Sequence, residues 1–368
     1  MKVHPADRPL LIAVTTLVLA GFFIFLSASM GLVARDGGAT FEGVVLKQFL
    51  IGIVGGVIAF FIFSRLQYRV LRKYAFYLFL GAFLLTLLVF IPGLGLNHGG
   101  ATRWLEVGSF SFQPAEVLKV AFVIYLAAWL SGVKGKVEEV KFGMLPFLVL
   151  VGFAGVALLL QPDIGTLLIV IIAGTAMYLA AGAPWKHLLM LFVIGALAAG
   201  AVLVIKPYAR ERVMTFLDPS RDPRGSGYQI QQSLIAIGSG GMFVKGFGQS
   251  VQKFNFLPEP IGDAIFAVFA EEWGFVGAVA LLGLFLFFAL RGIKIAAAAP
   301  DLFGGLLALG IVILVVSQAF ANIASMLGVF PLTGDPLPFV SQGGSAFLFG
   351  MAELGILANI SRFRKAGA

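Results

Sequence analysis

Long and nearly continuous apolar segments are the feature that most constrains the fold of this chain of 368 residues. An α-helix needs about 20 such residues to cross a hydrocarbon layer of roughly 30 Å. Ten segments meet this requirement, and the pattern predicts an all-α polytopic membrane protein that forms a single membrane domain over residues 1–368. The ten predicted spans are 10–31, 46–64, 74–93, 113–131, 144–161, 164–182, 187–206, 263–290, 302–328 and 341–361.

The composition excludes the main alternatives to a helical membrane protein. The chain is 60% hydrophobic and only 12% charged, whereas soluble domains carry about 25% charged residues. The apolar runs are continuous, while the strands of a membrane β-barrel alternate apolar and polar residues. The chain has no cysteine, which excludes disulfides, thiolate catalysis and cysteine-based metal sites.

The distribution of basic residues predicts how the chain lies in the membrane. Ten spans place both termini on the same side, and more than half of the 26 Lys and Arg residues then flank the segments on that side. Cytoplasmic loops are the ones that carry such an excess. We therefore expect the N- and C-termini in the cytoplasm. The long segment 207–262, between the seventh and eighth spans, is then expected to be extracytoplasmic.

The stretch from Asp218 to Glu272 is polar and rich in glycine, although it lies within an otherwise apolar chain. Long loops of this kind are usually functional or disordered. The cations in and beside it are expected outside the cell, where the cytoplasmic excess does not explain them. Arg and Lys bind phosphate groups well, although attraction to anionic lipid headgroups is an equally simple explanation. The candidate anion ligands are Arg210, Arg212, Arg221, Arg224, Lys245 and Lys253.

Asp263 ends this stretch at the start of the eighth apolar span. An acid in this place is often a helix cap, which the helix dipole favours. It is also suited to act as a general base if burial raises its pKa. The residues alone leave both interpretations open.

Several ionisable residues fall inside the predicted spans, where they are costly and normally paired. Glu116 and Lys119 lie one turn apart in the fourth span, and Lys119 is also a candidate partner for Glu271 and Glu272 in the eighth. For Glu271, Glu272 and Glu353 in the last span, we expect a structural role that holds helices together rather than a catalytic one.

Five motifs in this order resemble the SEDS family of cell-wall proteins, which comprises FtsW, RodA and SpoVE. They are GGATRWLEVGSFSFQPAEVLK (99–119), QPDIGT (161–166), FLDPSRDPRGSGYQIQQSLIAIGSGG (216–241), GFGQSVQKFNFLPEPIGDAIFAVFAEEWGFVG (246–277) and PLPFVSQGGSA (336–346). The stretch GQSVQK before FLPEP is similar to the FtsW/SpoVE branch rather than to the RodA branch.

The resemblance implies an enzyme, a peptidoglycan glycosyltransferase that polymerises lipid II at the outer face of the bacterial cytoplasmic membrane for septal wall synthesis. It implies that Asp263 is the essential aspartate. It also implies a class B penicillin-binding protein as transpeptidase partner, together with other divisome or elongasome membrane proteins, and no nucleic acid. A divalent cation such as Mg²⁺ or Mn²⁺ is a possible cofactor. Further expected site residues are Arg103, Glu116, Lys119, Gln232 and Ser341.

The chain departs from the family pattern at three places. Ile261-Gly262 stands where the family commonly has His-Thr, Gln342 stands where it has Tyr, and Asp335 is unusual beside the last motif. Three other functions remain open at this stage. They are a RodA-type elongation polymerase, a lipid II flippase that uses the buried charges as a transport path, and a non-catalytic scaffold for the transpeptidase.

Overall fold

The computed structural model describes residues 4–34, 40–98, 101–107 and 110–363. Parts of the 99–119 motif, at 99–100 and 108–109, lie outside these ranges.

Ten apolar helical segments occupy the positions of the ten predicted spans. Eight are long and apolar enough to cross a membrane, whereas α6 and α7 have 17 residues each. The protein is therefore a multi-pass membrane protein, and the count of ten crossings stays a prediction. The segments are α1 (Arg8–Ser29), α2 (Phe41–Lys47) continued by the π-helical η2 (Gln48–Val54) and α3 (Gly55–Arg65), α4 (Arg69–Leu87), α5 (Pro114–Gly132), α6 (Met144–Leu160), α7 (Ile164–Ala180), α8 (Trp185–Ile205), α11 (Ile265–Ala298), α12 (Leu302–Met326) and α13 (Gly344–Ser361).

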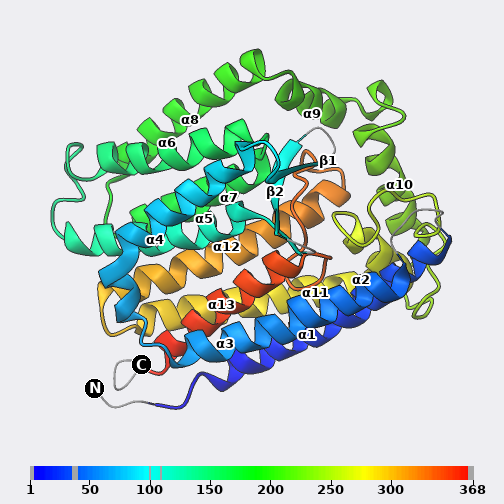
Figure 1. Ribbon diagram of the computed structural model, residues 1–368, viewed down its shortest axis with the longest axis horizontal. Helices are drawn as coiled ribbons and strands as arrows, with labels where there is room; N and C mark the ends of the chain where they lie inside the picture. Colours follow the sequence, from blue (N-terminus) through cyan, green and yellow to red (C-terminus); the bar gives the residue numbers. More distant parts are fainter. Residues whose placement is uncertain (1–3, 35–39, 99–100, 108–109, 364–368) are drawn as a thin grey trace.

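The helices form a bundle with α5, α12 and α13 at its centre, where most of their residues are buried. On one side α13 packs against α3, and α1 packs along α11. In Figure 1, α8 stands apart from the body at the opposite side. His187 is the only residue of α8 that is buried, so α8 has a surface suited to lipid rather than to the protein core.

The first and last described segments of the chain lie side by side, because the backbone amide of His4 donates to the carbonyl of Arg362 at 2.8 Å. Figure 1 shows the start of α1 and the end of α13 at one end of the bundle, with α9 and α10 at the other. This arrangement agrees with an even number of crossings. Which end faces the cytoplasm remains the prediction made from the basic residues.

A small antiparallel sheet lies at the same end as α9 and α10. Its strands are β1 (Gly95–His98), β2 (Ala101–Val107) and β3 (Phe110–Phe112), in the order β1-β2-β3. Leu105 stands at its centre, opposite Gly95 on one side and Phe112 on the other. The predicted spans 74–93 and 113–131 leave 94–112 as an unassigned connection, because strands this short give little periodic signal.

The predicted loop 207–262 is largely helical in its first half. It contains α9 (Pro207–Leu217), the short η4 (Pro219–Arg221) and α10 (Ser226–Ser239). Helix α10 buries Ile230, Ser233 and Ala236 and packs against α11. These helices are amphipathic and polar, so a search for apolar spans does not detect them.

Helix α11 is broken at Gly274, whose φ of 65° and ψ of −169° are not helical. The break frees backbone groups, which cannot remain unpaired in a membrane protein. The preceding loop supplies their partners. The amide of Phe275 donates to Gly241 O at 2.9 Å, and the amide of Lys245 donates to Glu272 O at 2.8 Å. The break divides α11 into a long half and a short half, and the short half begins two residues after Asp263.

Candidate active site

Asp263 lies in the turn that immediately precedes α11 and is partly buried. The N-cap residue of α11 is Ala264, and no side chain caps the helix. The carboxylate of Asp263 therefore does not serve as the helix cap that the sequence left open.

The backbone around Asp263 is fixed by three hydrogen bonds from residues distant in the sequence. Asn322 Nδ2 donates to Asp263 O at 2.9 Å. Ser341 Oγ donates to the carbonyl of Gly262 at 2.7 Å, and the amide of Gln342 donates to the carbonyl of Ile261 at 2.7 Å. These bonds engage main-chain atoms, so they hold the turn in place without occupying the carboxylate of Asp263.

The Asp263 carboxylate and the guanidinium groups of two arginines lie close to one backbone position, Gly334, whose φ is 74°. A Cβ atom at this position would lie 3.2 Å from Arg212 Nη2, 3.8 Å from Asp263 Oδ2 and 3.9 Å from Arg103 Nη1. The three charged groups therefore converge on one backbone position. Glycine suits it both for its positive φ and for the space it leaves.

Arg103 reaches this position from β2 and is anchored by carbonyl groups. Its Nε donates to the carbonyl of Gln161 at 3.0 Å, and its Nη2 donates to the carbonyl of Pro162. Nη2 also donates to the hydroxyl of Tyr208 at 3.3 Å. The turn between α6 and α7, which the sequence marks only as a polar break, thus holds a cation of the site.

Arg212 comes from α9, and its Nη1 donates to the carbonyls of Leu332 and Thr333 at 2.7 Å each. Its guanidinium group lies over the ring of Tyr208, 4.5 Å from the centroid. Tyr208 therefore contacts both Arg103 and Arg212. A planar guanidinium group held in this way presents its remaining N–H groups in a fixed direction, which suits phosphate oxygens.

Burial raises the pKa of Asp263 from its ordinary value to about 6. The negative charge of Glu259 adds to this increase, whereas Arg212 and then Arg103 oppose it. A carboxylate whose pKa lies near the working pH is a more effective general base than an ordinary aspartate. It remains ionised at neutral pH and can accept a proton.

Asp335, next to Gly334, is a second buried acid. Its Oδ1 accepts a hydrogen bond from Thr166 Oγ1 at 3.2 Å, and within the described residues its Oδ2 has no hydrogen-bond partner. Burial, followed by the negative charge of Asp163, raises its pKa well above the ordinary value. The residue that departs from the family pattern therefore stands beside the predicted catalytic centre.

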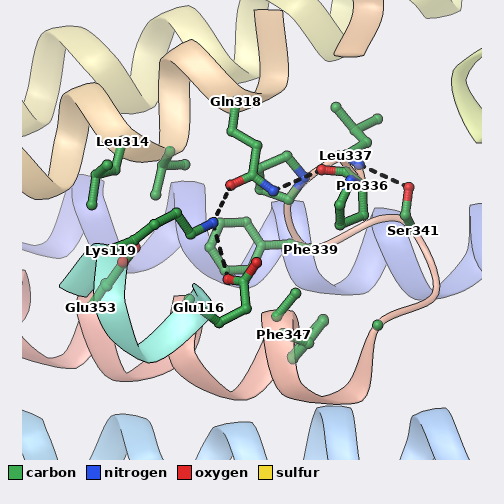
Figure 2. A pocket seen from close by; sticks show the side chains of 15 residues that line it. Glu116, Lys119, Leu314, Gln318, Pro336, Leu337, Phe339, Ser341, Phe347 and Glu353 are labelled. Atoms are coloured by element: carbon green, nitrogen blue, oxygen red, sulfur yellow. Dashed lines mark hydrogen bonds and ion pairs between the residues drawn. The ribbon is translucent and has the colours of Figure 1, made fainter. Parts of the chain in front are cut away.

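A small cavity, which shares Ser341 with this site, lies between α5, α12, α13 and the loop that precedes α13, and charged and amide side chains line part of it (Figure 2). Lys119 Nζ lies 3.0 Å from Glu116 Oε2 and donates to Gln318 Oε1 at 2.8 Å. Gln318 Nε2 in turn donates to the carbonyl of Pro336 at 2.9 Å. Glu353 also lines the cavity. The volume of the cavity is about 30 Å³, so the cavity has room for water but not for a sugar.

Lys119 therefore forms its ion pair with Glu116, and not with the acids of α11. Glu272 instead contacts Lys253 at 2.7 Å, and both side chains are almost completely buried, with 2% and 0% exposed. Lys253 consequently has no free face for a phosphate ligand, and we remove it from the set of anion ligands. Glu272 also accepts a hydrogen bond from Ser27 Oγ of α1 at 2.6 Å, and Glu271 accepts one from Ser250 Oγ at 2.5 Å, so these contacts agree with the structural role expected of both acids.

Most of the other predicted residues are spread over the surface of the same end. Within the described chain, Arg103 and Arg212 are the predicted cations whose charges act on Asp263. Arg221 pairs with Asp218 at 3.3 Å and is largely exposed. Gln232 is partly buried on α10, and the remaining cations, Arg210, Arg224 and Lys245, are exposed.

Sequence reasoning missed Tyr208, Asn322 and Gln318 as members of the site. Asn322 bridges two chain segments, because its Nδ2 also donates to Asp335 O at 2.9 Å. Gln318 and Asn322 are four residues apart in an apolar span, so they face the same side of α12. That pair of amides was a usable signal, since polar residues inside spans usually face the bundle interior. Tyr208 gave no comparable signal.

Comparisons with known proteins cover nearly the whole chain. A family model described as "Cell cycle protein", named for FtsW, RodA and SpoVE, matches residues 8–366. Stage V sporulation protein E of Bacillus subtilis is 38% identical over 365 residues, which are 99% of this chain and 100% of that protein. A probable peptidoglycan glycosyltransferase FtsW of Geobacter sp. is 38% identical over 87% of this chain and 86% of its own.

Two solved structures share the fold. One is a chain of a peptidoglycan synthase complex, from a study of how polymerization and crosslinking are coordinated. It has a TM-score of 0.80 and 32% identity, and the match covers 97% of this chain and 98% of that one. The other is the rod shape determining protein RodA of Thermus thermophilus, with a TM-score of 0.69 and 29% identity over 98% and 97% of the two chains.

Proposed function

The chain belongs to the FtsW/RodA/SpoVE family of cell cycle proteins, and we propose that it is a peptidoglycan glycosyltransferase that polymerises lipid II. The observation that carries the proposal is the partly buried carboxylate of Asp263, which has a raised pKa and faces two anchored arginines. A general base beside cations fits the transfer of a sugar from a pyrophosphate leaving group.

In the proposed reaction Asp263 accepts the proton of the 4-hydroxyl group of the acceptor sugar. The oxygen attacks the anomeric carbon of the lipid-linked donor strand and forms the new glycosidic bond. The bond from that carbon to the pyrophosphate breaks, and undecaprenyl pyrophosphate leaves with the electron pair. Because the attack and the departure occur on opposite faces of the sugar, the anomeric configuration inverts.

Arg103 and Arg212 are the groups that we propose to stabilise the charge of the leaving pyrophosphate. Their anchored guanidinium groups are oriented before substrate binds, which lowers the cost of stabilising new charge. The exposed Arg210, Arg221, Arg224 and Lys245 would attract the anionic substrate to this end of the protein. Within the described residues, no group of three or more acidic or histidine side chains could hold a metal ion. A divalent cation such as Mg²⁺ or Mn²⁺ stays a prediction from the resemblance, and the proposed step does not depend on one.

The test is polymerisation by purified protein in detergent, where no separate compartments exist. We expect lipid II to be converted into glycan strands, alone or with a class B penicillin-binding protein. The absence of polymer under both conditions would contradict the proposed activity. If transport of lipid II across vesicle membranes were then measured, the flippase alternative would be favoured.

The pH dependence of the rate provides an independent test of the base. Because Asp263 must be ionised to accept a proton, and its pKa is about 6, kcat/KM should fall as the pH decreases through about 6. An unperturbed aspartate would hold its activity down to about pH 4. A rate that stays constant from pH 7 to pH 5 would argue against Asp263 as the base.

The charges next to Asp263 should shift the pH at which kcat/KM falls, which is the acid limb of the profile, in opposite directions. Glu259 raises the pKa of Asp263, so Glu259→Gln should shift the limb to lower pH. Arg212 lowers that pKa, so Arg212→Gln should shift the limb to higher pH. The measurement is the pH profile of kcat/KM for both variants. Shifts in the same direction would contradict the assignment.

For the cellular setting, we propose a septal role at the outer face of the cytoplasmic membrane, with a class B penicillin-binding protein as transpeptidase. Relatives carrying the FtsW name and the similarity to a chain of a peptidoglycan synthase complex support this proposal. Depletion of the protein should block septation and produce filaments. Loss of rod shape with normal septation would favour the elongation role of the RodA branch.

A further inference from the structure

Lys253 and Glu272 form a buried ion pair that closes a loop of the chain. The two residues are 19 positions apart, and Lys253 Nζ donates to Glu272 Oε1 at 2.7 Å. Asp263 lies near the middle of the enclosed segment, ten residues after Lys253 and nine before Glu272. The ion pair thus joins the two ends of the loop, and the predicted catalytic carboxylate lies at its apex.

Further hydrogen bonds hold both ends of the loop, around Lys253 and around Glu272. Ser27 Oγ of α1 donates to Glu272 Oε1 at 2.6 Å, and Lys253 Nζ lies 3.1 Å from the same hydroxyl. Glu271 accepts hydrogen bonds from the amides of Val251 and Gln252, both at 3.2 Å. The two adjacent acids of α11 therefore hold the chain around Lys253 in two ways, because Glu272 binds the Lys253 side chain and Glu271 binds the backbone just before it.

The apex is held separately, by the bonds from Asn322 and Ser341 to Asp263 and Gly262. Between Lys253 and Asp263, Pro258 and Pro260 restrict the backbone, and Leu257 and Ile261 are buried. The bonds at the apex engage main-chain atoms only, and the first half of α11, which begins at Ile265 and is unbroken as far as Gly274, joins Glu272 to the apex as a rigid helix. A shift of Glu272 would therefore change where the Asp263 carboxylate lies relative to Arg103 and Arg212.

We propose that the Lys253–Glu272 ion pair is a positioning element that sets the place of Asp263 for the reaction, which rests on the proposed glycosyltransferase function. A buried ion pair is a weak source of net stability, because desolvation offsets much of the attraction. It is directional, however, and removal of one partner leaves an unpaired buried charge. Stability and positioning can therefore be separated by comparing single and double replacements.

The experiment uses Lys253→Met, Glu272→Gln and the double variant in the full-length protein. Each single variant should melt at a lower temperature, because one charge stays buried without its partner. The double variant should recover most of the melting temperature, since neither charge remains. Its kcat should nevertheless stay at least ~10-fold below wild type with KM nearly unchanged, because misplacement of a reacting group by about 1 Å lowers the rate strongly. Recovery of both properties in the double variant would overturn the proposal.

Arg291→Met is the matched control, because it breaks another ion pair of α11, at 2.5 Å from Asp7, near the opposite end of the helix. It should lower the melting temperature without changing kcat. Amide hydrogen exchange over 257–265 gives a second readout that needs no activity. Exchange there should increase in the double variant but not in Arg291→Met. If wild type makes no polymer, the proposed function fails, whereas unchanged exchange in the double variant overturns the positioning role.

Discussion

Replacement of Asp263 by Asn is expected to lower the polymerisation rate by about 10²- to 10⁴-fold, the range that a general base contributes. Asn has nearly the same size and shape, but its amide cannot accept the proton of the attacking hydroxyl. The turn itself should survive, since Asn322, Ser341 and Gln342 bind its backbone and not its carboxylate. The measurement is kcat with lipid II, together with the melting temperature.

Glu259→Gln is the control for this variant, because Glu259 is an exposed carboxylate four residues earlier in the same turn region. At pH 8 Asp263 is ionised both in wild type and in Glu259→Gln, so Glu259→Gln should retain nearly the full polymerisation rate. A similar loss of rate in Asp263→Asn and Glu259→Gln would mean that the negative charge of the turn matters, rather than a proton-accepting role of Asp263. An Asp263→Asn protein that retains its rate, or that supports normal septation in cells, would instead favour the scaffold alternative.

The second large effect is expected from Gly274→Val at the break in α11. The φ of 65° is strained for any residue with a Cβ atom, and this atom would lie 2.6 Å from the carbonyl oxygen of Phe243. A backbone with φ of 65° and ψ of −169° is essentially restricted to glycine and costs of order 1–3 kcal/mol for other residues, and the contact adds to that cost. We expect a clearly lower melting temperature and a loss of polymerisation, because the short half of α11 begins beside Asp263.

Gly283→Ala provides the comparison within the same helix. A Cβ atom at Gly283 meets nothing within 4 Å, and Ala favours a helix over Gly by roughly 1 kcal/mol. This variant should be as stable as wild type or more so, with unchanged activity. If Gly274→Val behaved in the same way, the break would have no role in placing the short half of α11.

Much of the architecture could be predicted from the sequence because membrane spans are set by local composition. The boundary between α6 and α7 shows this well. The turn Gln161-Pro162-Asp163 predicts the end of one helix and the start of the next, and α6 ends at Leu160 while α7 begins at Ile164. The elements that were missed, such as the short strands and the amphipathic α9 and α10, lack a long apolar run.

The candidate site could be predicted only in part, because its members come from six separate segments. The motif around Asp263 marks one residue, and the physical reason for its raised pKa lies in burial and in neighbours such as Glu259, Arg212 and Arg103. Lys253 shows the opposite case. Its place in a polar loop suggested an anion ligand, whereas packing against α1 and α11 buries it beside Glu272.

The sequence by itself determined that this protein is a helical membrane protein of the FtsW/RodA/SpoVE family, and it singled out Asp263. Both depend on short-range properties, namely runs of apolar residues and contiguous motifs. Only the tertiary structure decided which charges meet. Arg103 and Arg212 converge with Asp263 at Gly334, and Lys253 closes the loop with Glu272. Electrostatic partners are chosen by distance in space, and that distance depends on how the helices pack.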